Sequence, residues 1–185
     1  MRESEKVLVD CGANIGRGLK VLLERFNCKQ VYAFEPNPAL IPILDTISPL
    51  DGTSVETICK AVWCRDEVRP FYLGHHESST LLDGKVVPSI YNRQIDYEAP
   101  IFVDCVDFSR WLGSLNLGPK SAIVKMDIEG AEYPVLEHLI SQGTIGLISK
   151  LLVEWHYDRF PDFPDERHQR LVSTLSQHVQ IEEWD

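Results

Sequence analysis

Apolar runs of strand length alternate along this chain with segments of helical periodicity, and several of the runs end at an acidic residue. Val7–Val9 ends at Asp10, a second run ends at Glu35, and Ala122–Met126 ends at Asp127. This alternation favours a parallel sheet covered by helices on both faces. In such sheets, ligands bind outside the carboxyl ends of the strands. The pattern therefore predicts an α/β fold whose functional residues gather at one edge of the sheet.

Periodicity also places the individual elements. We expect strands over 7–10, 30–34, 55–63, 69–73, 101–106, 122–126, 147–153 and 179–184, and helices over 15–26, 39–47, 107–112, 130–140 and 167–178. The charged segment at 64–68 predicts a hairpin between two of the strands. Residues 75–97 have weak periodicity and several turn formers, which predicts a long functional loop or lid. Its Tyr91, Arg93 and Tyr97 would shape the pocket of a substrate.

Length, charge and cysteine usage limit the function classes. We expect one domain over residues 1–185. The formal charge of −10 argues against nucleic-acid and anionic-membrane partners, but it does not repel a cationic ligand. No apolar run approaches the roughly 18 residues of a membrane span, and residues 1–6 do not resemble a signal peptide. Cys11, Cys59 and Cys105 lie in apolar runs, which predicts buried thiols in a reducing cytoplasm rather than a zinc site.

A glycine-bearing turn follows the first strand, with the pattern Asp10-x-Gly12-x-Asn14-x-Gly16. Glycine permits positive φ and a close approach to a ligand, and asparagine tolerates left-handed geometry better than most residues. The helix after the turn directs free N–H groups toward an anionic group such as a carboxylate. Taken alone the turn is weak evidence, because any strand-to-helix connection can use glycine.

Glu35 ends the next strand, 25 residues after Asp10. A carboxylate here can accept both ribose hydroxyls of a nucleoside, and the separation is near the ~20 residues expected of such an acid. A solvated acid at a strand end is the alternative explanation. The turn does not match the G-x-G-x-x-G of dinucleotide folds, because Asn14 stands at the second glycine position. The carboxylate of Asp10 would suit an ammonium or sulfonium group better than a pyrophosphate.

Acidic residues crowd the turn after the strand at 122–126. Asp127 ends that strand and is the best functional candidate of the turn, whereas capping of the next helix explains Glu132 better than catalysis does. Glu154 and His156 follow another buried strand and would share a face if the strand continues. A histidine there could serve as a general base for a hydroxyl group. A hydrogen-bonded structural pair is the alternative.

Taken in order, these stretches resemble the FkbM family of methyltransferases. The specific matches are Val9–Gly16, Tyr32–Pro38 and Lys125–Glu132, and the weaker ones are Lys60–Val62, Glu77–Leu81 and Val153–His156. The resemblance implies a Rossmann-like class I methyltransferase fold and S-adenosylmethionine as cofactor. It also implies methyl transfer to a hydroxyl oxygen, with sugar units of glycans or polyketide-type natural products as acceptors.

The resemblance further assigns the cofactor site by position. Asp10, Gly12, Asn14 and Gly16 would surround the methionine portion, Glu35 would hold the ribose, Lys60 and Ala61 would lie near adenine, and Asp127 would face the methionine amino group or the acceptor. This fold usually ends with a reversed strand hairpin, but residues 179–185 suffice for one strand. We therefore expect a compact or shortened variant that lacks the last strand, and the oligomeric state stays open.

The expected reaction is an in-line transfer of the sulfonium methyl to an acceptor oxygen. The donor is already activated, so the protein mainly aligns the reactants and removes the hydroxyl proton. We expect His156 as the base, followed by Glu129 or Asp127. A less favoured variant uses a divalent metal ion held by Asp127, Glu154 and His156. The rival functions are a non-catalytic S-adenosylmethionine-binding module and a nucleotide-dependent oxidoreductase.

Overall fold

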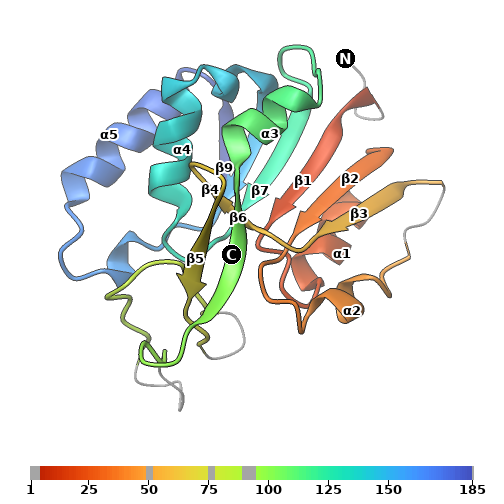
Figure 1. Cartoon of the computed structure of the whole chain (residues 1–185). Helices are drawn as coiled ribbons and strands as arrows, with labels where there is room; N and C mark the ends of the chain where they lie inside the picture. Colours follow the sequence, from red (N-terminus) through yellow and green to blue (C-terminus); the bar gives the residue numbers. More distant parts are fainter. Residues whose placement is uncertain (1–4, 49–51, 75–77, 89–94, 185) are drawn as a thin grey trace.

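The computed structural model describes residues 5–48, 52–74, 78–88 and 95–184. Its main sheet has six strands, all parallel, in the order β3-β2-β1-β7-β8-β9 (Figure 1). The strands are β1 (Val7–Cys11), β2 (Gln30–Phe34), β3 (Ser54–Ile58), β7 (Ala122–Met126), β8 (Ile148–Val153) and β9 (Gln180–Glu183). The predicted α/β architecture with a mostly parallel sheet is confirmed.

Side chains of the main sheet alternate between its two faces, as the strand period of two requires. On one face, Leu8, Val31 and Ile123 pack with Leu19 and Leu22 of helix α1 (Arg17–Arg25). The short helix α2 (Ile41–Leu44) adds to this layer. Helices α3 (Phe108–Ser114), α4 (Glu132–Ser141) and α5 (Asp165–Ser176) pack on the opposite face. Helices therefore cover both faces, as the sequence predicts.

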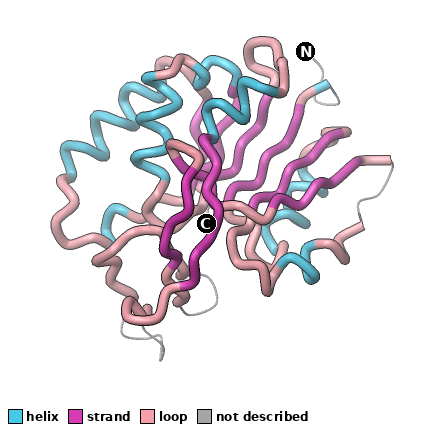
Figure 2. Tube along the Cα trace, viewed as in Figure 1, coloured by secondary structure: helices cyan, strands magenta, loops and turns pink. Residues whose placement is uncertain are grey.

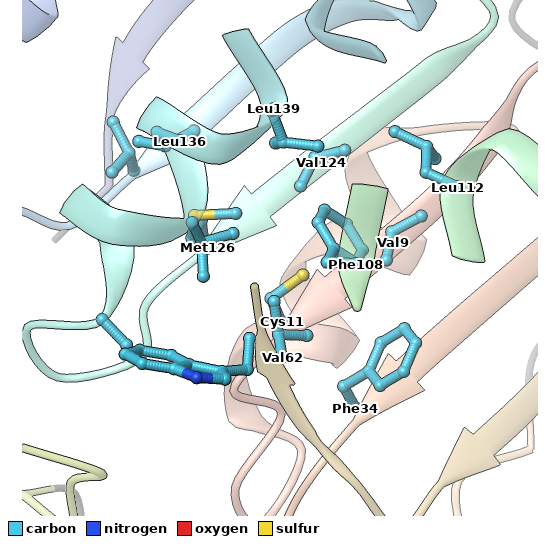
Figure 3. Packing of buried hydrophobic residues seen from close by; sticks show 14 of the residues in the cluster. Val9, Cys11, Phe34, Val62, Phe108, Leu112, Val124, Met126, Leu136 and Leu139 are labelled. Atoms are coloured by element: carbon cyan, nitrogen blue, oxygen red, sulfur yellow. The ribbon is translucent and has the colours of Figure 1, made fainter. Parts of the chain in front are cut away.

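The larger part of the core lies between the main sheet and helices α3 and α4. Figure 3 shows Val9 and Cys11 of β1 and Met126 of β7 meeting Phe108 of α3 and Leu139 of α4. All five side chains are fully shielded from solvent. Burial of this kind contributes about 1.5–3 kcal/mol for each large apolar side chain. The core therefore fixes the ends of β1 and β7 against each other, and functional turns follow both strands.

Three strands that lie between β3 and β7 in the sequence form a second, smaller sheet (Figure 2). Its strand order is β4-β6-β5. Its strands are β4 (Ala61–Trp63), β5 (Glu67–Phe71) and β6 (Ile101–Asp107). The predicted single strand at 55–63 is wrong, because the chain turns at Lys60, whose N–H donates to the Ile58 carbonyl, and passes into this sheet. The predicted hairpin is also wrong. β6 lies between β4 and β5 and pairs with both, so the two do not pair with each other.

Local sequence signals explain where several helices begin. Asp107 caps α3 through a hydrogen bond from the N–H of Arg110, as expected for an acidic N-cap. Pro42 lies in the first turn of α2, which tolerates a residue without N–H, and the predicted helix at 39–47 shortens to Ile41–Leu44. Two short 3₁₀ segments, η2 (Thr144–Leu147) and η3 (Tyr157–Arg159), flank β8.

The strand order reverses between β1 and β7, because the chain runs outward from β1 to β3 and then returns to β7. Ligand sites of open α/β sheets lie at such a switch point, outside the carboxyl ends of the strands. At the far edge, β9 pairs in parallel with β8. Up to residue 184, the described part of the chain adds no antiparallel strand to this sheet.

The five cysteines are free thiols, and their burial differs from the prediction at one position. Cys11, Cys28 and Cys105 are buried, whereas Cys59 is exposed because it lies at the turn between β3 and β4. Among the described residues, no helix has the length and apolar character that crossing a bilayer requires.

Candidate functional site

The glycine turn after β1 lies directly against the turn after β7. Gly12 has φ +86°, and a Cβ on it would lie 1.9 Å from the carbonyl oxygen of Asp127. The N–H groups of Gly12 and Ala13 both donate to the carbonyl of Phe34, at 3.1 and 2.9 Å. Only glycine combines this backbone conformation with this close approach. The turn is therefore held by both neighbouring strands, β2 and β7.

Glu35 meets this turn at the tip of β2, as the sequence predicts. Its Oε2 accepts the N–H of Asn14 at 2.9 Å, and its Oε1 accepts the N–H of Asn37 at 2.8 Å. Burial raises the pKa of Glu35, although the two backbone N–H groups act to lower it. The side chain is 5% exposed, so its position is fixed before any ligand binds.

A buried lysine holds the two turns together from beneath. The ammonium group of Lys125 donates to the Gly12 carbonyl at 2.9 Å and lies 3.2 Å from carboxylate oxygens of both Asp10 and Asp127. Burial acts to lower the pKa of Lys125, but the two carboxylates raise it well above its usual value. Asp10 is itself fully buried, and burial raises its pKa. Lys125 therefore stays charged and links β1 to β7.

A cavity of about 430 Å³ opens above this linkage. Most of the predicted cofactor residues line it: Gly12, Asn14, Glu35, Lys60, Ala61 and Asp127. Asp10 and Gly16 do not line it. Asp10 lies beneath the cavity against Lys125, and Gly16 serves the turn, since it has φ +81° and packs against Ile47.

A group of acids and cations lies beside this cavity. Glu132 is fully buried and accepts the N–H groups of Ile128 and Gly130, both at 2.8 Å, so it organises the turn before α4. His156 lies between two carboxylates, with Nδ1 3.1 Å from Glu132 Oε1 and Nε2 3.1 Å from Glu129 Oε2. Glu129 also forms an ion pair with Lys85.

The surroundings of His156 argue against its predicted role as the base. Burial acts to lower the pKa of the imidazole, but hydrogen bonds to Glu132 and Glu154, with the charge of Glu129, raise it to about 11. The ring is therefore an imidazolium at neutral pH and has no free lone pair. Burial raises the pKa of Glu129 to about 7, although His156 and Lys85 act to lower it. A carboxyl with this pKa has a proton affinity that suits a general base.

A second cavity, of about 510 Å³, adjoins the first, and Asn14, Glu129 and Glu154 line both. The segment predicted to form a functional loop or lid lies between β5 and β6 and supplies one wall of this second cavity. Tyr97 supports that wall from behind by donating its hydroxyl to the Lys85 carbonyl at 3.0 Å. Tyr91 and Arg93, also predicted to shape this pocket, lie outside the described residues.

Asp127, Glu129 and His156 are close enough to be considered as a metal site, since ligand atoms of the three lie within 4.8 Å of one another. In this arrangement, however, the Lys85 ammonium and the His156 ring both contact Oε2 of Glu129. The two cations already compensate the carboxylate that an ion would need. The donor set therefore does not fit a divalent ion, and we derive no step through one.

Sequence reasoning missed three residues that build the site. Lys125 carried a signal, because a lysine inside a strand that is otherwise wholly apolar must find buried partners. Thr80 lies in the weakly matching stretch Glu77–Leu81 but was given no role, and Lys85 carried no signal because it belongs to the segment with weak periodicity. Thr80 is nevertheless fully buried and donates its hydroxyl to the carbonyl of Glu129 at 2.8 Å.

Comparison with known proteins agrees with this architecture. The model of the methyltransferase FkbM domain matches residues 10–181. A crystal structure of methyltransferase FkbM from Methylobacillus flagellatus KT is similar with a TM-score of 0.54 at 16% sequence identity, a likeness of fold. It covers 97% of this chain but 38% of that one, so the chain spans less than half of its structural relative. No curated protein matches significantly. Since the family model covers most of its residues, the chain belongs to the FkbM methyltransferase family.

Proposed function

We propose that residues 1–185 form one methyltransferase domain that uses S-adenosylmethionine to methylate a hydroxyl oxygen of a sugar, glycan or natural-product acceptor. The observation that carries this proposal is that two cavities adjoin along a boundary that includes Glu129. One cavity has the glycine turn and the buried Glu35 on its wall, and the other lies under the predicted lid. A donor and an acceptor in these two spaces would meet beside a carboxylate.

The first cavity suits the chemistry of the cofactor. Its carboxylates are Glu35, Asp127, Glu129 and Glu154, and its cations are Arg17, Lys60 and Lys125. The carboxylates around this cavity favour a sulfonium cation. Glu35 would hold the ribose, and the start of α1 would face the carboxylate of the methionine portion. When bound, S-adenosylmethionine supplies an activated methyl group.

Within this proposal, the protein's own task is to place the acceptor and to remove its proton. Glu129 accepts the proton, because its pKa near 7 matches a neutral working pH. His156 acts as a positioning residue, since Glu132 fixes one ring nitrogen and the other contacts Glu129. Asp127 stays bound to Lys125 at the floor of the cavity.

Calorimetry with S-adenosylmethionine tests the cofactor assignment. We expect the wild-type chain to bind, and Glu35→Ala to weaken binding by about 10- to 100-fold, because hydrogen bonds to a charged group are worth about 1.5–3 kcal/mol. Glu24→Ala, at an exposed position on α1, is the matched control and should bind normally. Absence of wild-type binding would contradict the proposal, and tight NADH binding would favour the oxidoreductase instead.

A methyl-acceptor screen tests the reaction itself. Neutral sugars, oligosaccharides and hydroxylated polyketides are incubated with the chain and S-adenosylmethionine, and products are detected by their mass increase. A methylated oxygen is the expected result. Cofactor binding without turnover of any acceptor would support the non-catalytic binding module.

A further inference from the structure

We propose that Lys85 is a positioning residue that holds the carboxylate of Glu129, so that the loop between β5 and β6 completes the proton-accepting part of the site. This inference rests on the proposed role of Glu129 as the base. It concerns a residue far from Glu129 in the sequence, in a segment that sequence reasoning assigned only to a lid.

Lys85 is buried, and its charged group is held by partners within the site. Its side chain is 2% exposed, although lysine is almost never fully buried unless it is paired. The ammonium group forms an ion pair with Oε2 of Glu129 and donates to the carbonyl of Ser78 at 3.2 Å. Its backbone carbonyl accepts the Tyr97 hydroxyl. A cation that is withdrawn from solvent this completely must be held by its partners.

Thr80 attaches the same loop to the backbone of Glu129. Its hydroxyl donates to the Glu129 carbonyl at 2.8 Å, and its own backbone pairs with Tyr72. Glu129 has φ 59°, a left-handed conformation that few residues with a side chain adopt. The loop therefore contacts both the backbone and the side chain of Glu129.

The charged groups around Glu129 make the environments of its two carboxylate oxygens different. Lys85 from the loop and His156 from the end of β8 both contact Oε2. Asp127, in the same turn as Glu129, repels the charged carboxylate and acts to raise its pKa. Glu132 and Glu154 act on Glu129 through His156. Among the described residues, the cationic contacts thus fall on one oxygen. The other, Oε1, is then left to accept a proton from the acceptor hydroxyl.

The test measures the titration of Glu129 without any acceptor. The side-chain carboxyl of Glu129 is followed by ¹³C NMR in wild type, Lys85→Met and Lys85→Arg, with Lys20→Met on exposed α1 as the matched control. Loss of an adjacent cation should raise the pKa of Glu129 by at least about one unit in Lys85→Met. Lys85→Arg keeps a cation, so the pKa of Glu129 should stay close to its wild-type value. Lys20→Met should leave the pKa of Glu129 unchanged. A pKa in Lys85→Met equal to that of wild type would overturn the inference.

Kinetics with the acceptor found in the screen provide the second measurement. Lys85→Met should lower kcat by about 10- to 100-fold, within the range for impaired acid–base catalysis, and leave the S-adenosylmethionine Kd within about twofold. Thr80→Val keeps Lys85 and should lower kcat less than Lys85→Met does. It replaces Lys85→Met in this test if that variant does not fold. An unchanged kcat in both variants would overturn the inference while the proposed function stands. A wild type that binds no S-adenosylmethionine would instead overturn the proposed function and this inference with it.

Discussion

Replacing Gly12 with alanine should destabilise the fold strongly, because two separate costs meet at this residue. Gly12 has φ +86°, where a side chain costs roughly 1–2 kcal/mol. An added Cβ would also lie 1.9 Å from the carbonyl oxygen of Asp127, and real Cβ contacts essentially never fall under 3.0 Å. The Asp127 turn would have to retreat, and overpacking of this kind costs about 1–3 kcal/mol. We therefore expect Gly12→Ala to lower the free energy of unfolding by about 2–5 kcal/mol.

Two other glycines separate these costs. Gly143 has φ +74° with no atom within 4 Å of an added Cβ, so Gly143→Ala should lose only the conformational part, about 1–2 kcal/mol. Gly113 lies inside α3 with open space around it, so Gly113→Ala should be neutral or stabilising by up to about 1 kcal/mol. Denaturant unfolding monitored by circular dichroism gives the free energies. If Gly12→Ala proves as stable as Gly143→Ala, the contact between the two turns does not constrain residue 12 and the reasoning is wrong.

The kcat of methyl transfer should rise with pH through an apparent pKa near 7, because Glu129 must lose its proton to act as the base; Glu129→Gln should remove this limb and lower kcat by about 10²- to 10⁴-fold. Dialysis against EDTA should leave the methylation rate unchanged, and a loss restored by Mg²⁺ would contradict the charge compensation of the site. Asp107→Ala should lower the free energy of unfolding by about 1 kcal/mol in denaturant titrations, because α3 loses its N-cap. Arg25→Ala should lower the free energy of unfolding by about 0.2–1 kcal/mol at pH 7, because Arg25, together with Lys150, lowers the pKa of Glu182 to about 2; the difference should shrink as pH falls from 4.5 toward 2.

The centre of the sheet could be predicted from the sequence because β1 and β7 are buried on both faces. Ala122–Met126 is an unbroken buried run bounded by polar residues, and its bounds agree with the prediction at every residue. The run at 55–63 reads as one strand in the sequence, yet it divides between two sheets. Periodicity reports burial and not the partner strand, so a chain that leaves one sheet for another shows no change in pattern.

The site could be predicted where residues follow strands directly and could not where a loop returns to it. Gly12 and Glu35 lie together because β1 and β2 are paired neighbours, and strand pairing follows from the alternation of elements. Lys85 and Thr80 reach Glu129 through a segment whose path depends on tertiary contacts. The protonation of His156 was also beyond reach, because it depends on two carboxylates that only the folded turn brings to its ring.

A parallel sheet that gathers acids at one edge must also bring cations there, and which acid remains able to accept a proton depends on where the cations come from. Lys125 rises from within β7 and binds Asp10 and Asp127, so these carboxylates are committed to holding β1 and β7 together. Each carboxylate oxygen of Glu35 accepts a backbone N–H group from a turn. Glu129 differs, because its compensating charges come from a loop and a strand end and fall on one oxygen. The charge of Glu129 therefore depends on the loop between β5 and β6, whereas Asp10 and Asp127 are compensated within the sheet by Lys125.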